Sequence, residues 1–147
     1  MKLSLLIAAL VAVAGCRGFM TPSRAFDLVI DQPPAVDPLP IRVVDTSGYV
    51  QQVTVRQGEV LPPFEGRGGL SNPAGRPNDL VVQWVGGACD ERAQLDVSIG
   101  GEGRLHLEMR TEVAPGDCDA IGITRALWLS LSVPIDPSEA NLDFALK

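Results

Sequence analysis

The stretch AQLDVSIGGEGRLHLEMR, residues 93–110, decides the fold class. Apolar and polar residues alternate over 93–99 and again over 104–110, which is typical of β-strands that bury one face. The glycine-rich residues 100–103 lie between the two runs and suit a tight turn, so we expect a β-hairpin. A one-residue shift in its register would expose every inward apolar side chain, and the pairing is therefore well specified.

Shorter patterns predict further strands on both sides of this hairpin. Alternating or β-branched runs favour strands at 24–30, 41–45, 49–56, 125–133 and 142–146, and one helical turn fits 136–140. The continuous apolar run 80–85 predicts a strand buried on both faces. Residues 45–48, with Asp first and Gly fourth, suit a type I turn that would join 41–45 and 49–56 as a hairpin. Residues 66–79 are mostly turn-forming and predict a long loop.

These elements together predict an all-β fold in a single domain over residues 25–147. About seven to nine short strands, with no sustained helical period, favour an antiparallel β-sandwich. Immunoglobulin domains are β-sandwiches that combine a tryptophan on a strand with a pair of cysteines, and the architecture predicted here resembles theirs. In those domains the tryptophan lies between the two cysteines, whereas Trp84 precedes both Cys89 and Cys118.

The N-terminal residues have the pattern of a secretory leader. Lys2 precedes an apolar run over 3–13 that is interrupted only by Ser4 and is too short to span a bilayer. Two cleavage sites compete. Residues 12–14, Ala-Val-Ala, fit an ordinary signal peptidase, which would release a soluble protein. Residues 13–16, Val-Ala-Gly-Cys, resemble the lipobox of bacterial lipoproteins, in which cleavage precedes a lipidated cysteine.

The number of cysteines favours the lipoprotein. The chain has Cys16, Cys89 and Cys118, and ordinary secretion would leave an odd thiol in an oxidising compartment. Lipidation of Cys16 leaves the other two to form a disulfide, which would brace the hairpin of residues 93–110. The chain-entropy model gives such a bond about 3.5 kcal/mol of stabilisation. Neither cysteine belongs to a Cys-x-x-Cys motif, so a structural bond is favoured over a redox or metal site.

The resemblance to bacterial lipoproteins implies a location. Residues 1–15 would be the signal peptide, and 16–24 the lipidated cysteine with a short tether. The acyl chains on Cys16, palmitate among them, would hold the domain at the cell envelope. The residue after Cys16 is Arg17 and not aspartate. In Gram-negative lipoproteins, the absence of aspartate at this position favours sorting to the outer membrane. In an organism with one membrane the anchor would lie in its outer leaflet.

Composition and charge exclude some classes of partner. A hydrophobic content of 46% argues against disorder. The net charge of −6 argues against nucleic acid and against electrostatic docking on anionic lipids. The membrane is therefore expected to be contacted through the lipid anchor.

The sequence has no recognisable catalytic signature and implies no cofactor and no metal centre. The one histidine, His106, is expected on the solvated face of its strand, and no serine lies in a Gly-x-Ser-x-Gly context. Four carboxylates flank the two later cysteines and are candidates for a cation or ligand loop, with turn capping as the alternative: Asp90, Glu91, Asp117 and Asp119. Arg67 and Arg76 are candidates for a partner-binding loop.

These features favour a non-enzymatic binding or structural module at the cell envelope. An envelope protein or a polysaccharide is the expected partner, recognised by loops at the ends of the sandwich. The alternative is a small hydrolase, or a calcium-dependent enzyme, that acts on envelope polymers.

Overall fold

The computed structural model describes residues 22–30, 38–56, 59–117 and 121–145. Within these ranges the chain forms the following elements: β1 (Arg24–Ile30), β2 (Leu39–Asp45), β3 (Val50–Thr54), β4 (Gly68–Ser71), β5 (Asp79–Gly87), β6 (Asp90–Ile99), β7 (Leu105–Val113), β8 (Gly122–Leu131), a 3-10 turn η1 (Pro137–Glu139) and β9 (Ala140–Phe144). No helix in these ranges is long and apolar enough to cross a membrane. Cys16, with the predicted signal peptide and most of the predicted tether, lies outside the described residues.

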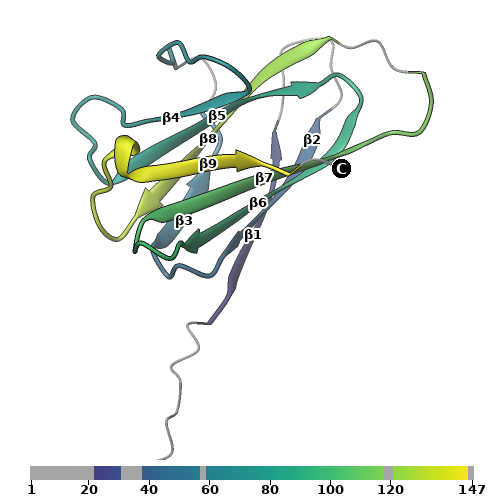
Figure 1. Ribbon diagram of the computed structural model, residues 1–147. Helices are drawn as coiled ribbons and strands as arrows, with labels where there is room; N and C mark the ends of the chain where they lie inside the picture. The colour runs from purple at the N-terminus through teal and green to yellow at the C-terminus, as the bar shows by residue number, and fades with distance from the viewer. Residues whose placement is uncertain (1–21, 31–37, 57–58, 118–120, 146–147) are drawn as a thin grey trace, which may run out of the picture.

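The described strands form two sheets that lie against each other as two layers (Figure 1). One sheet has the order β1-β2-β6-β7-β9, and the other has the order β3-β8-β5-β4. Apolar side chains between the layers form one core, and several of them, such as Val43, Leu95, Leu107 and Leu129, have no exposed surface. The predicted all-β sandwich is therefore confirmed at the level of its two sheets.

The five-stranded sheet is mixed, not antiparallel. Strand β2 runs parallel to β6, and β7 runs parallel to β9. The prediction of an antiparallel sandwich is wrong at these two pairs, and the sheet lacks the strand pairing of immunoglobulin domains. Parallel neighbours cannot be joined by a tight turn. Here the chain passes through the four-stranded sheet between the members of each pair.

The central hairpin forms as its sequence predicts. Strands β6 and β7 pair antiparallel, with Gln94 opposite Arg110 and Ile99 opposite Leu105. The inward side chains from Ala93 to Val97 and from Leu105 to Met109 are buried, whereas Ile99, at the hairpin end, is 40% exposed. The alternating pattern thus gave both the pairing and the inward face correctly.

The predicted hairpin over residues 41–45 and 49–56 is wrong. Strand β2 belongs to the five-stranded sheet and β3 to the four-stranded sheet, so the turn between them carries the chain across the sandwich. Asp45 is fully buried, and its carboxylate accepts hydrogen bonds from the backbone N–H groups of Ser47 (2.9 Å) and Val50 (3.1 Å) and from the Ser47 hydroxyl. These bonds fix a bend that redirects β3 away from β2.

The predicted long loop over residues 66–79 contains strand β4, which pairs antiparallel with β5. Its two glycines are required by close packing. A Cβ atom on Gly68 would lie 2.5 Å from the backbone oxygen of Gln83, and one on Gly69 would lie 2.7 Å from the Cβ of Phe64. The glycines are needed here because neighbouring groups pack closely against the strand. A prediction based on composition takes the same glycines as a turn signal.

Strand β5 is buried on both faces from Leu80 to Trp84, as its apolar run predicts, while Val85 is 37% exposed. The chain segment before β4 contacts the outer face of this sheet: the Gln83 side-chain amide donates to the Pro62 backbone oxygen at 3.1 Å. Trp128 of β8 is also buried. The Arg56 guanidinium lies over its ring, 5.9 Å from the centroid.

Candidate functional site

A pocket of about 620 Å³ opens on the outer face of the five-stranded sheet. We call it the sheet-face pocket. Its lining comes from β1, β2, β6 and β7 and comprises Asp27, Leu28, Pro40, Ile41, Arg42, Glu91, Arg92, Ala93, Gln94, Arg110 and Glu112. The volume is within the range of about 300–1,000 Å³ that is usual for ligand pockets. The pocket thus lies on paired strands and not on the end loops where recognition was expected.

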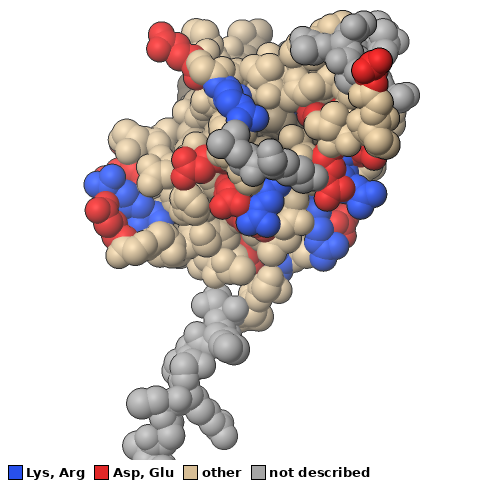
Figure 2. Space-filling model, turned by 45° about the vertical axis from the view of Figure 1, so that its right-hand side comes forward, with Lys and Arg blue, Asp and Glu red and all other residues tan. Residues whose placement is uncertain are grey.

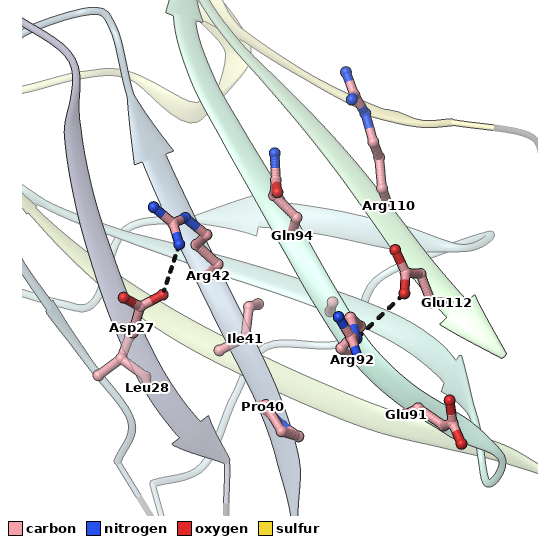
Figure 3. A pocket seen from close by; sticks show the side chains of 11 residues that line it. Asp27, Leu28, Pro40, Ile41, Arg42, Glu91, Arg92, Gln94, Arg110 and Glu112 are labelled. Carbon is pink, nitrogen blue, oxygen red and sulfur yellow. Dashed lines mark ion pairs between the residues drawn. The ribbon is translucent and has the colours of Figure 1, made fainter. Parts of the chain in front are cut away.

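Strand register places the polar side chains of the pocket in rows across the sheet. Asp27 is opposite Arg42, Arg42 is opposite Gln94, and Gln94 is opposite Arg110. We call these four residues the central row. Neighbouring strands are about 4.8 Å apart, so the backbones of Arg42 and Arg110 lie about 10 Å apart with Gln94 between them. Figure 3 shows the side chains of Arg42, Gln94 and Arg110 extending from three adjacent strands on the same side of the sheet.

The cations of the pocket all have carboxylate neighbours. Arg42 lies 3.7 Å from Asp27, and Arg92 lies 3.2 Å from Glu112, with more than half of each of these side chains exposed. Exposed ion pairs of this kind contribute about 0–1 kcal/mol each. A negatively charged ligand group can therefore replace Asp27 or Glu112 beside its arginine at little cost in free energy.

Arg110 is held more firmly than the other two arginines. Its Nε donates to Glu108 at 2.6 Å, and its Nη2 lies 3.2 Å from Asp96. The hydrogen bond to Glu108, together with the negative charges of Asp96 and Glu108, raises the pKa of Arg110. Gln94 donates from its amide to the same Asp96 at 2.7 Å. Asp96 therefore orients two neighbouring side chains of the central row.

Side chains of both charges are interspersed on the surface in Figure 2, with no large area of one sign. The pocket repeats this pattern, because its lining holds three arginines and three carboxylates. Of its four apolar lining residues, only Pro40 has an exposed side chain; Leu28 packs partly against the core, and Ile41 and Ala93 are buried in it. No residue of the lining carries a hydroxyl, thiol, imidazole or amine group. This composition suits the binding of a polar ligand with an apolar face.

Of the four carboxylates predicted to form a cation or ligand loop, the three that the structure describes have different surroundings. Asp90 is buried in an ion pair with Arg125, at 3.2 Å, and also accepts from the Gly87 N–H at 2.8 Å. Glu91 instead lines the sheet-face pocket. Asp117 is exposed on the β7–β8 connection, and Asp119 lies outside the described residues. Among the described residues, no group of three or more His, Cys, Asp or Glu is placed to hold a metal ion.

Asp90 is not available to a cation or ligand because it is buried in an ion pair with Arg125. The Arg125 side chain is 1% exposed, and its guanidinium also donates to the Gly87 backbone oxygen at 3.2 Å. Burial lowers the pKa of Arg125, and the adjacent charge of Asp90 opposes that effect. The Asp90–Arg125 pair therefore joins β6 to β8, one strand from each sheet, and serves the fold.

The two arginines predicted for a partner loop contact other parts of the chain. The Arg67 guanidinium lies 4.9 Å from the centroid of the Phe144 ring. Arg76 lies 3.7 Å from Glu59 and 4.0 Å from Asp79. The two residues flank β4 at opposite ends, so the structure does not bring them together as one site.

His106 lies on the outer face of β7 and is one-third exposed, with its Nδ1 3.6 Å from Asp143 of β9.

Cys89 lies in the turn between β5 and β6, and its backbone oxygen accepts from the Ala114 N–H at 2.9 Å. Cys118 lies outside the described residues, so the disulfide remains a prediction.

The arginines of the sheet-face pocket were not predicted from the sequence as site residues. Arg42, Arg92 and Arg110 occupy outward strand positions, where a charged residue is the ordinary solvated choice. The register of the predicted hairpin already places Gln94 beside Arg110. Only the parallel pairing of β2 with β6, which the sequence does not indicate, adds Arg42. Comparison of the chain with protein-family models, curated proteins and solved structures finds no match, so no relative assigns a role to these residues.

Proposed function

We propose that this protein is a lipid-anchored protein of the bacterial cell envelope, and that its β-sandwich is a non-enzymatic module that binds a polar ligand in the sheet-face pocket. The observation that carries the proposal is the central row, in which Arg42, Gln94 and Arg110 come from three adjacent strands to one pocket. Envelope proteins and polysaccharides are the partners that this location offers.

The construction of the pocket supports binding. Strands β2, β6 and β7 are paired on both sides, which fixes the backbone under the polar side chains. A rigid floor limits the conformational entropy that is lost when a ligand binds. The lining supplies arginines, carboxylates, one amide and apolar surface, and none of its residues has a thiol, imidazole or hydroxyl group. This set favours recognition over catalysis.

The anchor is supported by the lipobox resemblance of residues 13–16. Strand β1, which contributes Asp27 and Leu28 to the pocket, begins at Arg24, eight residues after Cys16. A lipid on Cys16 would therefore hold the pocket close to the membrane surface. The outer membrane, or the outer leaflet of a single membrane, follows from the same resemblance.

The proposed disulfide between Cys89 and Cys118 would close the end of the sandwich at which β6 begins and β7 ends. The hydrogen bond between Ala114 and Cys89 brings the β7–β8 connection against the β5–β6 turn, four residues before Cys118. That proximity supports the pairing, because a disulfide requires Cα atoms within about 7 Å.

One mass-spectrometric measurement tests the cysteine chemistry. Mature protein is purified from membranes and digested without reductant. The N-terminal peptide is expected to begin at Cys16 and to carry diacylglycerol, and Cys89 is expected to be joined to Cys118. A Cys16→Ser variant should lose the lipid and keep the disulfide. A mature chain that begins at Gly15, or three unmodified thiols, would contradict this part of the proposal.

The binding half of the proposal is tested in cells with a photo-reactive amino acid at Gln94. Ser98 is the matched control, because it occupies the same face of the same strand outside the pocket. The account predicts covalent adducts from position 94 well above those from position 98.

A further inference from the structure

The central row presents two positive side chains on either side of a neutral amide. Arg42 and Arg110 each lie opposite Gln94 in the strand register, and all three line the pocket. A guanidinium has five N–H donors in a planar fork that suits carboxylate oxygens. The row is therefore matched to a ligand with two carboxylates separated by a neutral polar unit.

Arg42 retains most of its binding capacity. In the described part of the chain its guanidinium makes one ion pair, with Asp27, at 3.7 Å, which is beyond hydrogen-bond distance. Asp27 is 73% exposed and lies on the edge strand β1. An incoming carboxylate can thus take the N–H donors of Arg42 without displacing a hydrogen bond.

Arg110 uses Nε for Glu108 and Nη2 for Asp96. Among the described residues none contacts its Nη1, which is the donor we assign to a ligand, and the two carboxylates fix the orientation of the fork. Because these contacts already hold the side chain, ligand binding at Arg110 loses less side-chain freedom than at a mobile arginine.

The pocket lining also decides between a peptide and a saccharide. The backbones of β2, β6 and β7 are paired on both sides, so they offer no main-chain edge to an extended peptide. Recognition must come from side chains, and the donors lie on the same face of the sheet as the exposed ring of Pro40. A sugar ring has an apolar face and a polar edge, which fits this combination.

We infer that the sheet-face pocket binds an acidic saccharide, with successive sugar carboxylates on Arg42 and Arg110 and a hydroxyl-bearing sugar edge on Gln94. This inference rests on the proposed function and names its ligand class. The overall negative charge of the chain repels acidic polymers at long range. Binding therefore depends on direct contacts with the arginines of the pocket.

Calorimetric titration of the full-length protein in detergent micelles tests the ligand class. Trigalacturonate is the acidic probe, uncharged trigalactose is the neutral probe, and inorganic phosphate distinguishes a general anion site from a saccharide site. Trigalacturonate is expected to bind at least about tenfold more tightly than either of the others, and to weaken as salt is added. Equal affinity for both saccharides would overturn the inference, and so would tighter binding of phosphate.

Three variants assign the binding to the row. Arg42→Gln is expected to weaken trigalacturonate binding about tenfold, while Asp27→Asn strengthens it by removing the competing carboxylate. Arg104→Gln is the matched control: Arg104 is 55% exposed, as Arg42 is, and pairs with Glu102 at the hairpin end, outside the pocket. Unchanged binding in Arg42→Gln, or weaker binding in Asp27→Asn, would contradict the inference.

The same titration separates this inference from the proposed function. A chain that binds no saccharide, but still forms adducts from position 94 in cells, overturns the ligand class and leaves the binding module intact. A chain that forms no such adducts overturns both.

Discussion

Replacing Arg125 by alanine is expected to lower the free energy of unfolding by about 3–5 kcal/mol. Asp90, 3% exposed, would keep its charge in the interior without a cation beside it. The Gly87 backbone oxygen would lose its guanidinium donor as well. Urea unfolding of the full-length protein, followed by the fluorescence of the buried Trp84 and Trp128, measures the change.

Two further variants show whether the loss of stability comes from breaking the buried Asp90–Arg125 pair or from removing an arginine in general. Arg104→Ala removes an exposed arginine paired with Glu102 and is expected to change stability by less than about 0.5 kcal/mol. Replacing both members of the buried pair, as Asp90→Leu with Arg125→Met, is expected to recover most of the loss, because no uncompensated charge is then left inside. A loss below about 1 kcal/mol in Arg125→Ala would contradict this account of β6 and β8.

The second large effect is expected at Asp45, where the chain passes from one sheet to the other. Asp45→Ala should lower the free energy of unfolding by about 1–3 kcal/mol, because the buried Val50 N–H and the Ser47 donors lose their acceptor. The same urea measurement applies. Asp45→Asn keeps one oxygen acceptor and is expected to lose less than the alanine variant.

Asp136 provides the matched control for Asp45. Its carboxylate accepts from the N–H and the hydroxyl of Ser138, as that of Asp45 accepts from Ser47, but the Asp136 bonds are exposed. Water replaces a lost bond at an exposed site, so Asp136→Ala is expected to change stability by less than about 1 kcal/mol. Equal losses at the two positions would show that burial of Asp45 does not stabilise the turn.

Local patterns predicted those parts of the fold that local pairing determines. The β6–β7 hairpin, the doubly buried run in β5 and the 3-10 turn after Asp136 all form where the sequence places them. Each depends on neighbours within a few residues, or on alternation along one strand. The strand position of Arg125 also carried a signal, because it shares the inward face of Leu127 and Leu129.

Long-range pairing explains what the sequence did not predict. The parallel neighbours β2 and β6 are separated by three strands along the chain, and no turn signal marks such a pair. The type I turn signal at 45–48 is the same whether the flanking strands pair or separate, and the sequence does not show that the Asp45 carboxylate is buried. The central row of the sheet-face pocket forms only when β2 pairs with β6. It could not be predicted from the sequence, because that pairing could not.

The sheet-face pocket is expected to be occupied in the envelope, and cross-linking from Gln94 in living cells measures this occupancy. A photo-reactive amino acid is placed at 94 or at 98, cells are irradiated, and mass-shifted protein is quantified in the membrane fraction. The account predicts adducts from position 94 several-fold above position 98, and a loss of this excess when Arg42→Gln is added. Equal adducts from the two positions, unaffected by Arg42→Gln, would contradict it.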